Sequence, residues 1–373
     1  MTRRIIQFGT SRFLQAHVDL FVHQARLSGQ SIGPITVVKT TSGHDRAGRI
    51  AALKRGRPFP IYVRGIENGR VIDETIEVAS VDQAFDAQQE WPAVVRCFAS
   101  EADIAVSNVS DRGYDSPDKD AGHDFSSLTP PHSFPAKLLV LLLARFRESG
   151  RPLLFLPTEL VSSNGRRLAE VVAKLAVASC QPDAFRAWLA QSVRFVDTLV
   201  DRIVSEPIEP VGAVAEPYAL WAIRRGGFRE PFRHAAVRLV DDLEPVERLK
   251  IHILNLGHTV LADRWRKEGR PRGESVRAIL DMPTIADELA TIYAEEVVPG
   301  FMLQGMGAEA ERYVAATVER LRNPFLEHRL ADIAENHAAK LRNRVAAFLD
   351  WVRQLDPSFS APRLSAMLLA RLE

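Results

Sequence analysis

The sequence predicts a chain of two parts, an N-terminal α/β region built on a parallel sheet and a C-terminal region that is almost entirely helical. Short apolar, β-branched runs alternate with segments of helical periodicity through the first half. From Glu247 onward the periodicity is helical, and prolines mark the element boundaries. At 373 residues the chain also exceeds the length at which a single core stops growing. We therefore expect two domains, residues 1–245 and 246–373.

The chain opens with a strand, a tight turn and a helix. Arg3–Phe8 is a short apolar run that stops at Gly9, and Ser11–Leu27 carries apolar residues at helical spacing. This order is typical of a Rossmann-like dinucleotide-binding unit, in which the helix N-terminus binds a pyrophosphate. Where G-x-G-x-x-G is expected, the chain has Gly9-Thr10-Ser11-Arg12-Phe13-Leu14. One glycine allows the turn and the small Ser11 permits close backbone approach, although many other α/β proteins also begin with a strand and a glycine.

The alternation of strands and helices continues along the first half. Repeated strands with helical crossovers predict a parallel, doubly wound sheet that binds ligands at the carboxyl ends of its strands. The expected strands are Ile35–Lys39, Ile104–Val109, Leu153–Leu156 and Val193–Val196, and Val211–Ile223 and Val237–Val240 are expected to extend the same sheet. The expected helices are His44–Leu53, Phe134–Arg147 and Gly165–Ala178. A hairpin is expected over Ile61–Val71, turning at Glu67-Asn68-Gly69, and a loop over Asp111–Pro131.

The end of the second expected strand bears on the choice of nucleotide. In a Rossmann unit an acid at this position usually holds the adenosine ribose hydroxyls. Here the strand ends in Lys39-Thr40-Thr41, without an acid. Because Lys39 is able to bind a 2′-phosphate, the residues at the end of this strand do not distinguish NAD from NADP.

The segment Leu249–His258, LKIHILNLGH, carries an amine, a carboxamide and an imidazole at the start of the helical half. Lys250, Asn255 and His258 are five and three residues apart, so at about 100° per residue of helix they fall within an arc of roughly 140°. Such a group can accept a proton and stabilise an oxygen that gains negative charge. For the spacing alone, an ordinary polar helix is the more frequent explanation. The expected helices of this half are Leu249–Lys267, Thr284–Val297, Ala308–Leu321, His328–Trp351 and Ala361–Leu372.

Composition and charge exclude several classes of protein. Lys and Arg total 48 against 47 acidic residues, so no overall field favours nucleic acid or an anionic membrane. The two cysteines, Cys97 and Cys180, are far apart and form no CxxC motif, which argues against a disulfide framework or structural zinc. The longest apolar run, Leu138–Ala144, is too short to span a bilayer. Because residues 1–9 lack the apolar run of a signal peptide, we expect a cytoplasmic protein.

The spacing of Lys250, Asn255 and His258 matches K-x4-N-x2-H and resembles the signature of the polyol-specific long-chain dehydrogenases, the mannitol dehydrogenase family. Other blocks resemble the family in the same order, and two of them look like its tagaturonate reductase branch: Ser133–Leu138 and Pro157–Leu160. The remaining blocks are Gln7–Gly9 with Phe13-Leu14, Ser107-Asn108 with Gly113-Tyr114, Thr198–Ile203, Glu216–Trp221, and Asn323–His328 running on to Asn336 and Lys340. Three features depart from the family: Ser11 replaces a glycine, Gln15 replaces an arginine, and the chain is shorter.

The resemblance implies a fold, a reaction and a set of site residues. It implies NAD-dependent hydride transfer to or from a secondary alcohol, without a metal. Lys250 would be the general base, Asn255 would donate to the developing alkoxide, and His258 would hydrogen-bond the same oxygen or a neighbouring hydroxyl. The residues expected to bind the cofactor are Gly9, Thr10, Ser11, Phe13, Lys39 and Asn108.

The branch-level resemblance further implies a sugar-acid substrate such as tagaturonate or fructuronate. Lys340 and Arg344, four residues apart on a late helix, are expected to bind its carboxylate. Asp201 is expected to bind a substrate hydroxyl or to tune the lysine, and a structural ion pair with Arg202 is the alternative. A neutral polyol or ketose such as mannitol or fructose is the second candidate substrate. A non-catalytic NAD(P)-binding protein is the competing class, and the sequence makes no prediction of oligomeric state.

Overall fold

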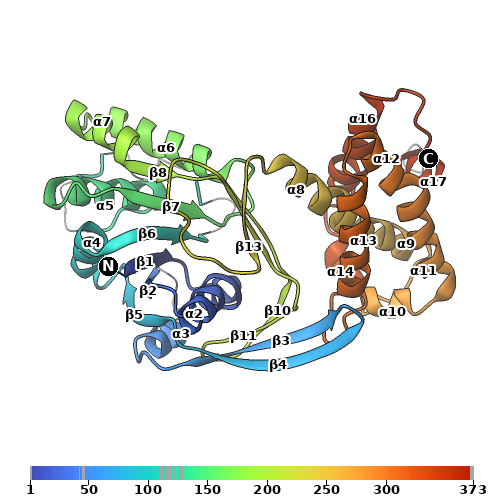
Figure 1. Cartoon of the computed structure of the whole chain (residues 1–373), viewed down its shortest axis with the longest axis horizontal. Helices are drawn as coiled ribbons and strands as arrows, with labels where there is room; N and C mark the ends of the chain where they lie inside the picture. Colours follow the sequence, from blue (N-terminus) through green and yellow to red (C-terminus); the bar gives the residue numbers. More distant parts are fainter. Residues whose placement is uncertain are drawn as a thin grey trace. The chain divides into compact units, whose positions relative to one another are not determined.

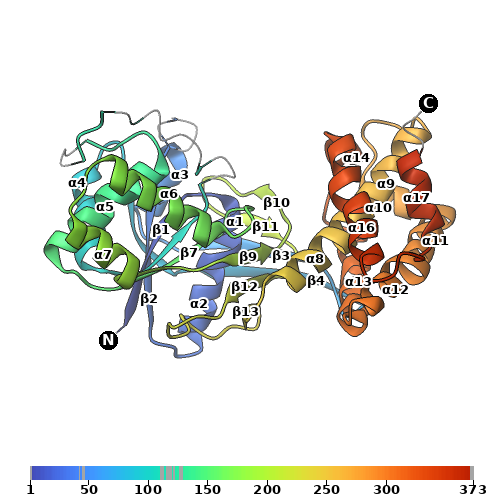
Figure 2. The same ribbon diagram turned by 90° about the horizontal axis from the view of Figure 1, so that it is seen from above.

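A computed structural model of the chain describes residues 2–41, 43, 47–109, 113–114, 120, 122–125 and 129–369, and Figures 1 and 2 show it from two directions. The chain forms two compact units. Unit 1 comprises Met1–Tyr62, Thr75–Ala215 and Ala219–Leu243, and unit 2 comprises Val63–Glu74, Glu216–Tyr218 and Glu244–Glu373. Unit 2 therefore contains two short segments from the first half of the chain, Val63–Glu74 and Glu216–Tyr218, which the sequence did not assign to it.

Unit 1 is built on a six-stranded sheet in the order β5-β2-β1-β6-β7-β8. Every neighbouring pair is parallel, which confirms the expected doubly wound sheet. The strand order reverses between β1 and β6, the position at which such sheets bind ligands. The strands are β1 (Arg3–Phe8), β2 (Ile32–Lys39), β5 (Val81–Asp86), β6 (Ala102–Ser107), β7 (Leu153–Pro157) and β8 (Val193–Phe195).

Helices cover this sheet, and the apolar strands are buried because both faces are covered. A core cluster joins β1, β6 and β7 to α4, α5, α6 and α7, and α2 lies on the other face of the sheet (Figure 2). Within this core, Phe8 packs against Phe134 with ring centroids 5.4 Å apart. The first helix is continuous and consists of α1 (Arg12–Leu14), η1 (Gln15–Asp19) and α2 (Leu20–Leu27), of which η1 is a π-helical turn. The others are α3 (Ala47–Leu53), α4 (Trp91–Ser100), α5 (Phe134–Glu148), α6 (Asn164–Ala178) and α7 (Asp183–Ser192).

Two expectations for this half fall partly on residues that the structure does not describe. The helix expected from His44 is described from Ala47 onward, and residues 44–46 lie outside the described part. Most of the loop expected over Asp111–Pro131 also lies outside it. The hairpin turn is confirmed, because β3 (Phe59–Glu67) and β4 (Arg70–Val78) are joined by Asn68 and Gly69 with φ values of 52° and 72°.

The expectation that Val211–Ile223 and Val237–Val240 extend the parallel sheet is wrong. The first of these stretches contains Pro217, which has no N–H to donate to a ladder, and it divides into two strands on either side of this residue. These strands, β11 (Ala213–Ala215) and β12 (Leu220–Arg224), join different sheets. One sheet has the order β10-β11-β3-β4, with β10 spanning Val204–Pro207. The other has the order β13-β12-β9, with β9 at Thr198–Asp201 and β13 at Val237–Val240.

Unit 2 is a helical bundle, as expected. The expectation of one helix over His328–Trp351 is wrong, because the chain breaks between α14 and α15, where Asn336 adopts a left-handed φ of 52°. In the described part of the chain, no helix is both long and apolar enough to cross a membrane. The elements are α8 (Glu244–Leu249), η4 (Lys250–Asn255), α9 (Leu256–Lys267), α10 (Val276–Leu280), α11 (Pro283–Ile292), η5 (Tyr293–Val297), α12 (Val298–Leu303), α13 (Gly307–Leu321), α14 (Leu330–Ile333), α15 (His337–Lys340), η6 (Leu341–Ala346), α16 (Ala347–Arg353) and α17 (Pro362–Leu369).

A buried carboxyl group lies in the core of unit 1. Asp19 is fully buried at the end of η1, and burial raises its pKa to about 8, an effect that the Gln7 amide only partly offsets. The Gln7 Oε1 atom is itself buried, and among the described residues it has no hydrogen-bond partner. The fold therefore favours the protonated form of Asp19 up to a pH near 8.

We expect Asp19→Asn to stabilise unit 1 increasingly as the pH rises from 4 to 8. In this window the folded chain keeps a proton that the unfolded chain, with a pKa of 3.8, has released, so wild-type stability falls with rising pH. Asparagine stays neutral and can donate to Gln7 Oε1. Urea unfolding followed by tryptophan fluorescence should show the variant's advantage growing by about 1 kcal/mol or more over the window. The exposed Asp241→Asn is the control, and a pH-independent difference for Asp19→Asn would contradict the prediction.

Candidate active site

The turn after β1 requires glycine at Gly9 for two independent reasons. Its φ is 125°, a conformation that L side chains rarely adopt, and a Cβ atom would lie 2.7 Å from the Asn108 carbonyl oxygen. Backbone hydrogen bonds fix the turn between the neighbouring strands, from Gly9 N to Val38 O and from Asn108 N to Phe8 O, each at 2.9 Å. The turn and Asn108 therefore meet at the carboxyl ends of β1 and β6, where the strand order reverses.

Ser11, which stands in place of the second glycine, uses its hydroxyl to hold this turn. The Oγ atom accepts from the Leu14 amide at 3.2 Å and so caps the first helix, and it donates to Asn108 Oδ1 at 3.0 Å. Asn108 Nδ2 in turn donates to the carbonyl and hydroxyl oxygens of Thr158 after β7, each at 3.2 Å. The turn, the helix N-terminus and two strand ends thus form one hydrogen-bonded frame around the position at which a pyrophosphate is expected.

The remaining residues of the turn are packed into the same frame. Thr10 is buried, and its carbonyl accepts from Gln15 Nε2 at 3.4 Å. Gln15 Oε1 accepts from the Gly212 amide at 2.9 Å, so the residue in place of the family's arginine ties the turn to the chain before β11. Phe13 stacks on His17 with centroids 4.7 Å apart.

Lys39 lies at the end of β2, as expected, but its ammonium group is already paired. Lys39 Nζ donates to Asp86 Oδ2 at 2.9 Å, and both side chains are less than a tenth exposed. Asp86 is the last residue of β5, and the two residues are in register on neighbouring parallel strands. The acid that is missing from the end of the second strand is therefore supplied by the next strand of the sheet.

Asp201 lies at the end of β9 in unit 1, buried and paired in register with Leu220. It lies near His17, whose pKa is lowered to about 3, mainly by burial of the imidazole, while the Leu220 carbonyl and Asp201 act in the opposite direction. Its neighbour Arg202 donates to the Ala16 carbonyl at 2.5 Å. The expected contact of Asp201 with a substrate hydroxyl stays a prediction.

In unit 2, Lys250 and Asn255 are the first and last residues of the π-helical segment η4. A π-helix has hydrogen bonds from residue i+5 to residue i, so a residue five positions along the chain lies above the first. Asn255 therefore lies above Lys250, and not about 140° around the axis as an α-helix would place it. The π-register brings the amine and the carboxamide onto one face of the helix.

His258 lies one turn further along, on α9, and is almost fully buried. Burial holds its pKa well below its usual range, and the nearby His328, Arg320 and Arg344 lower it further. The His328 ring packs against it with centroids 4.9 Å apart. His258 is therefore neutral at pH 7, so it can hydrogen-bond a substrate hydroxyl but does not add a charge.

The cationic side chains near His258 are all held by partners within unit 2. Lys340 Nζ donates to the Ile333 carbonyl at 2.7 Å. Arg344 Nη1 donates to the Asn255 carbonyl at 3.0 Å and to Thr259 Oγ1 at 3.1 Å. The expected binding of a carboxylate by Lys340 and Arg344 stays a prediction, but the contact of Arg344 with the backbone of the K-x4-N-x2-H segment was not foreseen.

A buried ion pair connects Glu216–Tyr218 to α13. Arg320 forms a two-pronged contact with Glu216, with Nη2 to Oε1 at 2.8 Å and Nε to Oε2 at 2.9 Å, and each side chain is 2% exposed. The guanidinium also lies over the ring of Tyr218, 4.2 Å from its centroid. Because Arg320 lowers the pKa of His258, this pair also contributes to the electrostatics of the candidate site.

Sequence reasoning missed three residues at these positions: Asp86, Tyr293 and His328. Asp86 belongs to β5, a strand that was not recognised because its sequence VDQAFD alternates poorly. Tyr293 donates its hydroxyl to the Ile253 carbonyl at 3.0 Å, a contact between residues 40 positions apart that no local pattern signals. His328 ends the Asn323–His328 block, which was the one signal that pointed to it. Among the described residues, no group of three or more His, Cys, Asp or Glu side chains is arranged to hold a metal ion.

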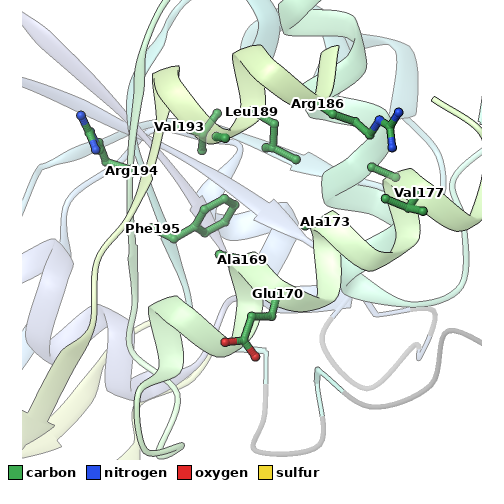
Figure 3. A pocket seen from close by; sticks show the side chains of 11 residues that line it. Ala169, Glu170, Ala173, Val177, Arg186, Leu189, Val193, Arg194 and Phe195 are labelled. Carbon is green, nitrogen blue, oxygen red and sulfur yellow. The ribbon is translucent and has the colours of Figure 1, made fainter. Parts of the chain in front are cut away.

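A surface cavity of about 470 Å³ in unit 1 lies apart from these residues, among α6, α7 and β8 (Figure 3). Leu189, Val193 and Phe195 lie in its middle, while the guanidinium groups of Arg186 and Arg194 point away from one another at its edges. None of the residues expected from the sequence to bind substrate or cofactor lines it. We therefore do not assign it to the active site.

Comparisons with known proteins show which proteins this chain is similar to. The altronate oxidoreductase of Halalkalibacterium halodurans is 27% identical over 99% of this chain and 75% of its own length. That of Yersinia pestis bv. Antiqua is 30% identical over 98% of this chain and 78% of its own length. Two solved structures share the fold at lower identity. Mannitol 2-dehydrogenase of Pseudomonas fluorescens, solved with NAD and D-mannitol, has a TM-score of 0.75 at 18% identity, covering 99% of this chain and 78% of that one. A substrate-free D-sorbitol dehydrogenase has a TM-score of 0.82 at 17% identity, covering 100% of this chain and 80% of that one.

The match to a family covers the parallel sheet and the strands that follow it as far as β12. The mannitol dehydrogenase Rossmann domain matches residues 3–232, which include the Gly9 turn, the end of β2 and Asn108. Together with the similarity to the altronate oxidoreductases over 98% or more of this chain, this match shows that the chain belongs to the mannitol dehydrogenase family.

Proposed function

We propose that this protein interconverts a secondary alcohol and a ketone on a sugar acid, with a hexuronate and its aldonate, such as tagaturonate and altronate, as the preferred pair. Family membership makes it a dehydrogenase that acts on CH–OH groups. The proposed chemistry rests above all on the π-register of η4, which puts a proton-transfer group and an oxyanion donor on one helix face. The altronate oxidoreductase relatives support the choice of substrate.

The residues of unit 1 fit a nicotinamide dinucleotide. The absence of a Cβ at Gly9, its left-handed φ and the capped helix N-terminus after it form a cradle that a phosphate fills. Gly9, Thr10, Ser11 and Asn108 would hold the pyrophosphate, and Phe13 would lie beside it. NAD, when bound, supplies the hydride acceptor for oxidation and, in its reduced form, the hydride donor.

Lys250, Asn255 and His258 would carry the proton transfer and bind the reacting oxygen. In the oxidative direction Lys250 takes the hydroxyl proton, and in the reductive direction its ammonium returns a proton to the alkoxide. Asn255 Nδ2 donates to the oxygen as negative charge develops on it. His258 is neutral because of its burial, so it orients the same oxygen or the neighbouring hydroxyl without competing for the proton.

The charge around His258 supports an anionic substrate. Burial is the largest cause of the low pKa of His258, and His328, Arg320 and Arg344 lower it further. Burial also lowers the pKa of His328, where Asp332 acts in the opposite direction and Lys340 in the same direction. Arg344 and Lys340 are cations that a substrate carboxylate would use and an uncharged polyol would not. Lys340 uses one of its three N–H groups on the Ile333 carbonyl. We propose that another binds the substrate carboxylate.

We expect the purified protein to reduce tagaturonate or fructuronate with NADH, and to oxidise an aldonate with NAD, far faster than it acts on fructose or mannitol. The reason is the carboxylate that only the sugar acids present to the cationic side chains of unit 2. Absorbance of NADH at fixed cofactor concentration measures all four reactions. Strong turnover of mannitol or fructose with none of a hexuronate or aldonate would contradict the choice of substrate.

A Lys250→Ala variant is expected to bind NADH with wild-type affinity but to lose about 10²- to 10⁴-fold in kcat, the range typical of general acid–base groups. NADH binding is followed by fluorescence titration and turnover by absorbance. Arg266→Ala, an exposed cation on α9, serves as the matched control and should keep wild-type kcat. Near-wild-type turnover by Lys250→Ala would refute the mechanism, and absence of turnover in the wild type would favour a binding protein without catalysis.

We expect the wild type to prefer NADH to NADPH, because Asp86 neutralises Lys39, the cation at the end of β2 that would otherwise bind a 2′-phosphate. Asp86→Asn leaves Lys39 uncompensated and should raise the NADPH to NADH ratio of kcat/KM by about tenfold, corresponding to about 1.4 kcal/mol. The double variant Lys39→Gln with Asp86→Asn removes both charges and should keep the wild-type ratio. Equal use of the two cofactors by the wild type would show that the ion pair does not select between them.

A further inference from the structure

Three π-helical segments of unit 2 meet around the residues proposed to carry the reaction. They are η4, η5 and η6, and η4 packs against both of the others. π-Helices account for well under 1% of residues in proteins and are frequent at functional sites. Because an i→i+5 helix is less favourable than an α-helix, three in contact call for a specific source of stability.

The carbonyl groups of η4 receive hydrogen bonds from side chains that are distant in sequence. The Tyr293 hydroxyl, from the first residue of η5, donates to the Ile253 carbonyl at 3.0 Å. Arg344 Nη1, from η6, donates to the Asn255 carbonyl at 3.0 Å, which also accepts from Thr259 Oγ1 at 2.8 Å. In the reverse direction His252 Nδ1–H, within η4, donates to the Arg344 carbonyl at 3.0 Å. The segments η4 and η6 therefore exchange hydrogen bonds, and η5 donates one more to η4.

The protonation states of these donors suit this task. Burial raises the pKa of Tyr293 far above its ordinary value, so its hydroxyl keeps its proton. Burial lowers the pKa of His252 to about 4, so the ring is neutral, and because a carbonyl can only accept, its proton is on Nδ1. Both donors thus stay fixed across the pH range in which a dehydrogenase works.

Gly257 makes the contact of Tyr293 possible. A Cβ atom at this position would lie 1.9 Å from the Tyr293 hydroxyl oxygen. Glycine inside a helix is less stable than alanine by about 1 kcal/mol, and here its missing side chain gives the phenol its path to the Ile253 carbonyl. Gly257 is therefore required for a hydrogen bond that η4 accepts in its π-register.

We infer that Tyr293, Arg344 and His252 are positioning residues that hold η4 in its π-register and so keep Asn255 above Lys250. They act through the backbone of the segment and need no contact with the substrate. If η4 relaxed to an α-helix, Asn255, five positions after Lys250, would lie about 140° around the axis from it, and the oxyanion donor would leave the face that carries the base. This inference rests on the proposed function, in which Lys250 and Asn255 act on the same oxygen.

Tyr293→Phe removes a single oxygen atom and is the main test. We expect kcat for reduction of the best sugar acid to fall by about 10- to 100-fold, as for small displacements of reacting groups, while KM for the sugar acid and for NADH stays within about twofold. Gly257→Ala keeps the hydroxyl but displaces it, so it should give the same loss. Arg342→Gln, an exposed arginine on η6, is the control for Arg344→Gln, which should lower kcat.

A second readout does not depend on turnover. Hydrogen exchange of the peptide amides in Leu249–Leu256, measured by mass spectrometry, should be faster in Tyr293→Phe than in the wild type and unchanged in Arg342→Gln. A purely structural role would lower the melting temperature but leave kcat unchanged, and an active wild type with kcat within twofold in Tyr293→Phe and Gly257→Ala would overturn the inference. An inactive wild type would refute the proposed function. In that case, amide hydrogen exchange of Leu249–Leu256 that is the same in Tyr293→Phe as in the wild type would refute the positioning role as well.

Discussion

The i→i+5 hydrogen bonding of Lys250–Asn255 is the constraint on which the chemistry proposed for unit 2 depends. An α-helix cannot put residues five positions apart on one face, because each residue advances the side-chain direction by about 100°. The π-register does so. It is held by groups from η5 and η6 whose own hydrogen bonds end on the carbonyls of this segment. The proposed base Lys250 and the proposed oxyanion donor Asn255 are thus aligned by backbone geometry, so neither side chain has to reach across a turn.

The expected cofactor site of unit 1 is likewise built by backbone geometry. The parallel sheet brings the ends of β1, β2, β5 and β6 to one edge, and each end contributes something different. Gly9 supplies space and a left-handed backbone, Ser11 and Asn108 lock the turn to the neighbouring strand, and Lys39 with Asp86 form a neutral pair. The loss of the second glycine of the fingerprint costs little, because the serine that replaces it caps the helix and binds Asn108.

His258 is kept neutral by its surroundings in unit 2. Burial of the imidazole is the largest cause, and the cations around it act in the same direction. Hydrogen bonds hold both arginines in place: Arg320 is paired with Glu216, and Arg344 donates to backbone and hydroxyl oxygens. Fixed cations produce a field without the entropy cost of ordering long side chains at each turnover.

Some misreadings of the sequence have a common physical cause. Val237–Val240 is a strand, as its composition predicts, but it pairs with β12 and not with the parallel sheet. The expected helix over His328–Trp351 contains Asn336, a residue that tolerates left-handed φ, and the chain breaks there. Strand composition indicates that a segment is extended, not which strand lies beside it, and an asparagine is compatible with both a continuous and a broken helix.

The sequence by itself determined the features that depend on neighbours in the chain. These are the strand–turn–helix at Gly9, the hairpin turn at Asn68-Gly69, the helical second half and the spacing of Lys250, Asn255 and His258, because periodicity and turn chemistry are local. Only the tertiary structure decided that Lys39 meets Asp86, 47 positions away, and that Tyr293 and Arg344 bind the carbonyls of η4. Such contacts are selected by packing of the whole unit, and a helix changes from α- to π-register when distant donors make the wider turn the more stable one.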